Sequence, residues 1–251
     1  MMKNFLFYAF FLSVGVYAQQ TNEHLRKMDS LLNNNQKDTV SIAVLLYNNV
    51  VLQDFAGPME VFSKAKNLTQ GLYRIFTVGL TPGEVYTENK LIKIRPDYSL
   101  DDFPHADYVM LPGANISEIN RLTKDQQLMD FLKTWNSKEN TKTISICTAA
   151  YLLAHTGVLN GRRATTHYFV ADDFSARYPK VHLVKDVRYV DEVKYLTTSG
   201  ITSGIDAALY LVGKHSGESI RSMISRALQY NFHEKERWPQ APQGMKYDSR
   251  Q

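Results

Sequence analysis

Cysteine is nearly absent from this sequence: Cys147 is the only one among 251 residues. A single cysteine excludes an intramolecular disulfide and a zinc site built from several thiolates. The seven histidines include no i, i+4 pair with an acid between them, so the sequence predicts no metal site. The lone thiol is either a small buried side chain or a reactive group, and its context must decide.

An excess of charge of one sign is also missing, because 29 Lys and Arg oppose 25 Asp and Glu. A net charge of +4 is too small to indicate a nucleic-acid footprint, so we expect no nucleic-acid partner. The composition, with 44% hydrophobic and 22% charged residues, is that of an ordinary globular protein. It excludes a disordered chain, a collagen and a disulfide scaffold.

No apolar run reaches the roughly 20 residues that a membrane-spanning helix needs. The longest one lies in the first 18 residues, MMKNFLFYAFFLSVGVYA, where Lys3 precedes it and Val16 and Ala18 fit a small-residue cleavage pattern. This arrangement predicts a signal peptide cleaved after Ala18 and a periplasmic or secreted protein with no membrane attachment afterwards. An uncleaved membrane anchor is the alternative.

After the signal peptide, the sequence divides into a polar leader (19–39), one domain (40–232) and a polar tail (233–251). Short apolar runs typical of buried strands alternate with helical patterns throughout the domain. This alternation predicts an α/β fold with a flavodoxin-like parallel sheet flanked by helices. Strands are expected at 41–47, 73–80, 107–112, 141–146 and 194–199, and helices from Gly57-Pro58, over 117–136, over 148–159 and in the last forty residues of the domain.

The segment TISICTAAYLLA predicts a sharp turn between a strand and a helix at Cys147. Ser145 and Ala149, two residues to either side, are small, as the tight backbone of a nucleophile elbow requires. The helix N-terminus directs free N–H groups and a partial positive charge at the sulfur. We therefore expect a lowered pKa for Cys147 and a reactive thiol.

Other candidates follow neighbouring strands, because ligands bind at the carboxyl ends of strands in this class of sheet. The N–H groups of Gly113, Ala114 and Thr148 are expected to stabilise negative charge on a substrate, although Pro112-Gly113 could form a plain turn. Asp54 follows the first strand and is expected to face the sheet edge; capping of the next helix is the alternative.

Two further residues are pocket candidates. His167 follows the polar pair Thr165-Thr166 at a helix start, and Thr202 lies in the loop TTSGITSGID after the last strand. Capping of the following helix by Thr202 or Ser203 is the alternative for that loop.

Four segments together resemble the ThiJ/PfpI superfamily, which has a class I glutamine amidotransferase-like fold: IAVLLYNNVVLQDFAGPMEVF, YVMLPGAN, ISICTAAYLLAHTGVLNGRRATTHY and TTSGITSGIDAALYLV. The resemblance covers about Ser41 to Phe232 and is nearest to isonitrile hydratase and to the amidase-like domain of AraC-type regulators. It implies that Cys147 is the nucleophile, Asp54 its acidic partner and Thr148 a contributor to activity, with His167 near the site. The sequence departs from the family at Ala114, where a second glycine is usual.

The resemblance implies a cysteine-dependent enzyme that acts on a small electrophile, with hydration of an isonitrile through a thioimidate as the specific reaction. It implies no cofactor and a homodimer. Two alternatives stay open: a non-catalytic module that binds a small molecule, and a thiol-based stress or redox protein.

Overall fold

The computed structural model describes residues 39–232. The signal peptide, the polar tail and all of the polar leader except Thr39 lie outside the described residues. Within the described range, no helix is both long enough and apolar enough to cross a membrane.

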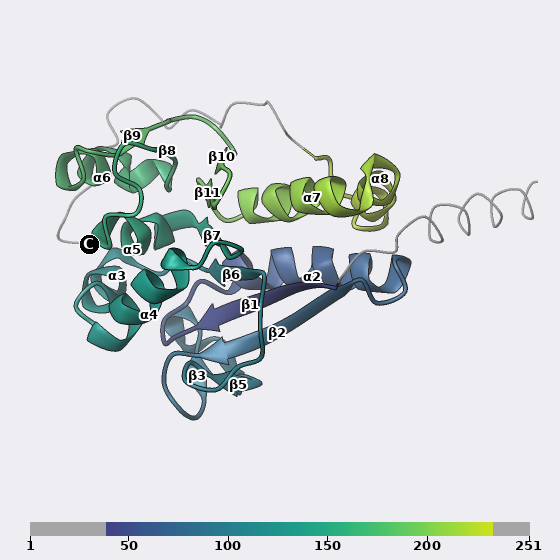
Figure 1. Cartoon of the computed structure of the whole chain (residues 1–251), viewed down its shortest axis with the longest axis horizontal. Helices are drawn as coiled ribbons and strands as arrows, with labels where there is room; N and C mark the ends of the chain where they lie inside the picture. The colour runs from purple at the N-terminus through teal and green to yellow at the C-terminus, as the bar shows by residue number, and fades with distance from the viewer. Residues whose placement is uncertain (1–38, 233–251) are drawn as a thin grey trace, which may run out of the picture.

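A seven-stranded sheet forms the centre of the molecule, with the strand order β10-β11-β7-β6-β1-β2-β5 (Figure 1). Every neighbouring pair is parallel except β10 and β11. The mostly parallel sheet confirms the predicted α/β fold. The strands are β1 (Val40–Leu46), β2 (Tyr73–Gly79), β5 (Tyr98–Ser99), β6 (Tyr108–Leu111), β7 (Lys142–Ile146), β10 (Tyr189–Glu192) and β11 (Tyr195–Thr198).

Strand β1 lies inside the sheet, between β6 and β2, and all of its residues, VSIAVLL, are buried. It pairs with β2 in a register that runs from Val40↔Tyr73 to Leu46↔Gly79, and with β6 on its other side. Helices cover both faces of such a parallel strand, which explains why its sequence is continuously apolar instead of alternating.

The helices gather in two groups (Figure 1). Helices α2, α7 and α8 pack on one another at one side of the molecule, and α3 to α6 lie at the other side. Their bounds are α2 (Leu52–Leu68), α3 (Ile116–Leu122), α4 (Gln126–Ser137), α5 (Ala150–His155), α6 (Ala171–Arg177), α7 (Ser203–Ser216) and α8 (Glu218–Ala227).

The helix after β1 begins five residues earlier than we expected, at Leu52, so the predicted start at Gly57-Pro58 is wrong. Proline at a first helical position was the basis of that prediction. In the structure Pro58 lies inside α2, where its missing N–H deprives only the Asp54 carbonyl of a partner. Burial of Phe55 and Phe62 along the same helix stabilises the longer form.

The single helix predicted over 117–136 is in fact two helices, α3 and α4. The Asp125 carboxylate accepts a hydrogen bond from the Leu128 N–H (3.0 Å) and so caps a new helix in the middle of the segment. The first helix is capped by Asn115, whose side chain accepts from the Glu118 N–H at 2.9 Å, and not by Ser117.

A short antiparallel pair joins β3 (Val85–Tyr86) to β4 (Lys93–Ile94). The helix after Cys147 is shorter than we predicted and ends at His155. Gly157 adopts a left-handed φ of 80° and its N–H returns to the Ala154 carbonyl (3.0 Å), which stops the helix there. A short parallel pair joins β8 (Arg163–Ala164) to β9 (His182–Leu183) outside the main sheet.

Candidate active site

Cys147 directly follows β7, on a strained turn. It is the first residue of a short 3₁₀ segment, η2 (Cys147–Ala149), that leads into α5. Its φ is +60°, a left-handed conformation that side chains with a Cβ rarely adopt. The Thr166 hydroxyl donates a 3.0 Å hydrogen bond to the Cys147 carbonyl and so holds the turn from the opposite segment. This backbone has the form of the nucleophile elbow that the sequence predicted.

Asp54 faces the same edge of the sheet from the first turn of α2, and its side chain is fully buried. Its Oδ2 accepts a 2.8 Å hydrogen bond from the Gly113 N–H. Its Oδ1 has no nitrogen or oxygen partner among residues 39–232. The capping alternative is wrong, because Val51 occupies the N-cap position of α2 and Asp54 binds a distant loop instead.

Burial controls the charge state of this pair. Desolvation raises the pKa of Asp54 to about 7, although the Gly113 N–H and the Cys147 thiol both favour the carboxylate and lower it. Desolvation also raises the pKa of Cys147 well above its usual value, and the negative charge of Asp54 raises it further. The Thr148 N–H lowers the pKa of Cys147 but is outweighed.

The expected lowering of the Cys147 pKa is therefore wrong. The helix N-terminus favours a thiolate, but burial of the sulfur and then the charge of the Asp54 carboxylate outweigh it. Both shifts favour the protonated forms, so the free protein holds a protonated thiol next to a carboxyl group whose pKa is raised far above that of an ordinary aspartate.

The expected free donors of the loop after β6 are already engaged. The Gly113 N–H binds Asp54, and the Ala114 N–H donates to Thr148 Oγ1 at 3.0 Å. The Thr148 hydroxyl in turn donates to the Ala114 carbonyl (2.6 Å). These N–H groups are engaged within the protein in this state, so the oxyanion role expected for Gly113 and Ala114 stays a prediction.

Gly113 has to be a glycine because three parts of the site converge on it. A Cβ at this position would lie 2.7 Å from Asp54 Oδ2, 2.8 Å from Thr148 Oγ1 and 2.9 Å from Cys147 Cβ. Any larger residue would force these groups apart. The loop after β6 thus joins Asp54, Cys147 and Thr148 into one cluster.

The two pocket candidates, His167 and Thr202, make contacts with different parts of the protein. His167 directly follows Thr166, and its Nδ1 accepts from the Phe169 N–H at 3.4 Å. Burial lowers the pKa of His167, so its ring is neutral at neutral pH. Thr202 makes no side-chain cap to α7; its exposed hydroxyl accepts from Arg188, which also forms an ion pair with buried Asp206 (3.3 Å). The Thr202 hydroxyl therefore belongs to a second cluster, which it forms with Arg188 and Asp206.

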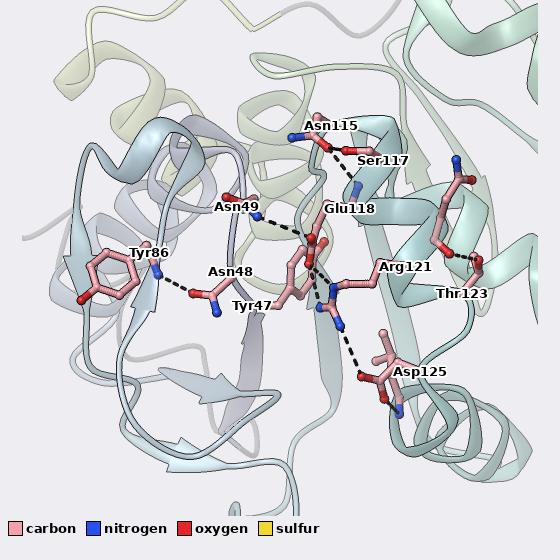
Figure 2. A network of polar contacts seen from close by, with 12 residues as sticks. Tyr47, Asn48, Asn49, Tyr86, Asn115, Ser117, Glu118, Arg121, Thr123 and Asp125 are labelled. Carbon is pink, nitrogen blue, oxygen red and sulfur yellow. Dashed lines mark hydrogen bonds and ion pairs between the residues drawn. The ribbon is translucent and has the colours of Figure 1, made fainter. Parts of the chain in front are cut away.

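Sequence reasoning missed the residues that support the loop after β6 from outside. Tyr47 follows β1, is fully buried, and donates a hydrogen bond from its hydroxyl to the Pro112 carbonyl. Figure 2 shows Tyr47 beside Glu118, whose carboxylate binds Arg121 (2.7 Å) and Asn49 (3.4 Å). A polar-tipped aromatic residue at the carboxyl end of a buried strand was the signal that could have revealed Tyr47.

The described residues 39–232 contain no group of three His, Cys, Asp or Glu side chains that could hold a metal ion. The cluster itself brings together the Cys147 thiol, the Asp54 carboxyl group, the Thr148 hydroxyl and backbone N–H groups.

The chain is similar to known proteins in both sequence and fold. The model of the DJ-1/PfpI family matches residues 40–214. The chain is 28% identical to isonitrile hydratase of Pseudomonas putida over 193 residues, which cover 76% of this chain and 78% of that protein. It is 27% identical to the HTH-type transcriptional regulator GbdR of Pseudomonas aeruginosa over 191 residues, which cover 76% of this chain but only 50% of the regulator. The crystal structure of Drosophila melanogaster DJ-1beta has the same fold, with a TM-score of 0.66 at 21% identity over 77% of this chain and 100% of that chain.

Proposed function

Since the chain belongs to the DJ-1/PfpI family, we propose that it is a cysteine-dependent enzyme that acts on a small electrophile, in the manner of an isonitrile hydratase. The observation that carries the proposal is the buried pair of Cys147 and Asp54 on a strained elbow, with the pKa of the carboxyl raised to about 7. A carboxyl group with that pKa can both accept and return a proton near neutral pH.

The thiol is protonated at rest, so it needs a base during attack. In the proposed reaction, ionised Asp54 removes the proton from the Cys147 thiol as the sulfur bonds to the terminal carbon of the isonitrile. Protonated Asp54 then gives that proton to the same carbon, which yields a thioimidate with an N=CH–S linkage. Water adds to the thioimidate carbon, the C–S bond breaks, the thiol regains a proton and an N-substituted formamide leaves. The net change is the addition of one water molecule to the isonitrile.

The other site residues support the proposal through geometry. The Thr148 N–H donates to the sulfur and favours its ionised form. The Thr166 hydroxyl maintains the strained backbone of Cys147. No step requires a cofactor.

The decisive experiment compares wild-type protein with Cys147→Ala against a panel of alkyl isonitriles, aldehydes and amides. Formation of the formamide by the wild type alone, together with an intact-mass adduct equal to the isonitrile, supports the reaction. Absence of turnover on the whole panel contradicts the proposal of an enzyme for these substrates.

The second candidate is a non-catalytic module that binds a small molecule. Two observations favour it: the engagement of the Gly113 and Ala114 N–H groups within the protein, and the similarity to transcriptional regulators over about half of their length. Saturable binding of a ligand that is equally strong in wild type and Cys147→Ala, without turnover, would support the module and oppose the enzyme. We expect no direct binding to nucleic acid in either case.

We further propose that the protein is exported to the periplasm or secreted, because its first 18 residues have the pattern of a signal peptide. The family resemblance also supports a homodimer. Sedimentation equilibrium tests that state directly, since a monomer of the full chain has a mass of 28.7 kDa.

A further inference from the structure

One peptide group lies between Tyr47 and Asp54. The Tyr47 hydroxyl donates a hydrogen bond to the Pro112 carbonyl, and the Gly113 N–H donates to Asp54 Oδ2 at 2.8 Å. That carbonyl and that N–H belong to the same planar amide, so they point in opposite directions from one rigid unit. An unbroken chain of hydrogen bonds therefore runs from the Tyr47 hydroxyl, through the amide, to the Asp54 carboxylate.

We infer that Tyr47 is a positioning residue, which orients and polarises the Pro112–Gly113 amide so that its N–H holds the Asp54 carboxylate beside Cys147. The inference deepens the proposed function, since it rests on that proposal for the role of Asp54 in proton transfer. Tyr47 acts on Asp54 through the Pro112–Gly113 amide.

The physical basis is the cooperativity of linked hydrogen bonds. A donor at the oxygen of an amide draws electron density toward that oxygen and makes the N–H at the other end a stronger donor. Tyr47 is only 2% exposed, so water cannot easily replace its hydroxyl if the side chain is shortened. The effect is largest in such a site because the local dielectric is low.

Other contacts hold the same loop in place without Tyr47. The Val51 N–H donates to the Gly113 carbonyl (2.9 Å), and Val50 forms an antiparallel bridge with Ala114. The loop should therefore keep its place in Tyr47→Phe, and the change isolates the polarisation of the amide.

The groups that act electrostatically on Tyr47 are Asp54, Cys147 and Glu118, and Glu88 acts on Asp54. Desolvation, followed by the charges of these three neighbours, raises the pKa of Tyr47 well above its usual value. Its hydroxyl consequently stays protonated, and remains a donor, over the whole range in which Asp54 titrates.

The test measures the titration of the Asp54 carboxyl in the full chain by ¹³C NMR, with Asp54→Asn used to assign the signal. Tyr47→Phe should raise the midpoint by about 0.5 to 1 pH unit, because a weaker Gly113 donor stabilises the carboxylate less. Tyr73→Phe is the matched control, since Tyr73 is equally buried but its hydroxyl pairs with Ser216 at the end of α7. An unchanged midpoint in folded Tyr47→Phe, or an equal shift in Tyr73→Phe, overturns the inference.

A second variant keeps the test decisive if Tyr47→Phe does not fold. Site-specific replacement of Tyr47 by 3-fluorotyrosine nearly preserves shape and makes the hydroxyl a stronger donor. It should move the Asp54 midpoint downward, opposite to Tyr47→Phe, and an unchanged or raised midpoint overturns the inference. Both measurements use the protein without substrate, so a failure of the proposed reaction leaves them interpretable.

Discussion

Asp54 Oδ2 and the Gly113 nitrogen lie 2.8 Å apart, although 59 residues separate them in the chain. This hydrogen bond joins the beginning of α2 to the end of β6 and fixes the carboxyl group beside the elbow. It favours the ionised form of Asp54, while burial favours the neutral form. The balance between these two effects gives the carboxyl a pKa of about 7, and several measurable properties depend on it.

Alkylation of Cys147 should begin only at alkaline pH. Because burial and the Asp54 charge raise its pKa, the iodoacetamide rate should rise with a midpoint above the roughly 8.5 of a free cysteine. Asp54→Asn removes the charge of Asp54, so the midpoint of Cys147 alkylation should be lower in this variant than in the wild type. Mass spectrometry of the single cysteine measures both rates, and a wild-type midpoint below that of a free cysteine contradicts the prediction.

Asp54→Asn should stabilise the protein at alkaline pH. The folded-state pKa of Asp54, about 7, lies above its ordinary value of 3.8, so the folded state binds the proton more tightly than the unfolded state. The free energy of unfolding contributed by this group is therefore fully present below pH 4 and is lost as pH rises toward 7. The full loss is on the order of 4 kcal/mol. Urea denaturation at pH 5 and pH 8 should show the variant gaining stability relative to wild type mainly at pH 8.

The same Asp54→Asn variant should lose most turnover on whichever substrate the panel reveals. Asparagine can still accept from the Gly113 N–H but cannot carry a proton, and general acid–base assistance is typically worth about 100- to 10,000-fold. Asp97→Asn is a matched control, since that carboxylate binds Thr77 away from Cys147. Wild-type turnover in Asp54→Asn would assign Asp54 to the scaffold.

Gly113→Ala should disturb the whole cluster. The new methyl group would meet Asp54 Oδ2, Thr148 Oγ1 and Cys147 Cβ at less than 3 Å, and overpacking of this kind typically costs about 1 to 3 kcal/mol. Gly213→Ala on α7 is the control, because its Cβ would meet only the flexible Arg221 side chain. Thermal denaturation should separate the two variants, and equal melting temperatures would contradict the packing argument.

Two buried threonines at the same sheet edge should respond in opposite ways to replacement by valine. Thr166→Val leaves the Cys147 carbonyl without its donor and should cost about 1 to 3 kcal/mol. The Thr198 hydroxyl has no hydrogen-bond partner within residues 39–232, so Thr198→Val should be neutral or stabilising. Denaturant titration of both variants checks the prediction, which fails if Thr166→Val is as stable as Thr198→Val.

Intact-mass measurement of the protein from its native host tests export. The mature chain should begin at Gln19, because the short apolar run ends in the pattern Val16 to Ala18. If the measured mass of the purified protein still includes residues 1–18, the prediction of cleavage is wrong.

The fold could be read from the sequence because its strands are short, apolar and separated by helices. The predicted run 41–47 differs from β1 by one residue at each end, since seven consecutive buried residues leave little choice. Helix boundaries were less predictable. Pro58 indicated a helix start that the structure does not have, and Asp125 divides a segment whose apolar period continues through it.

The site was predictable only in part, for an electrostatic reason. The pattern around Cys147 indicated the elbow, and Asp54 was expected at the same sheet edge. The charge states of Cys147 and Asp54 depend on how deeply both side chains are buried and on how closely they approach each other. Spacing along the chain specifies neither. The engagement of Ala114 with Thr148 likewise arises from contact between two loops separated by 34 residues.

The long separations within the cluster also bear on the order in which the molecule assembles. Asp54 lies 59 residues before Gly113, and Thr148 lies 34 residues after Ala114. The cluster can therefore form only after β1, β6 and β7 have aligned. Contacts of such high sequence separation close slowly, because the entropy of the intervening loops is lost first. During folding the thiol therefore passes through a period without its carboxylate neighbour, when it titrates as an ordinary cysteine. Protection of Cys147 from a fast thiol reagent in a refolding experiment would time the alignment of the three central strands.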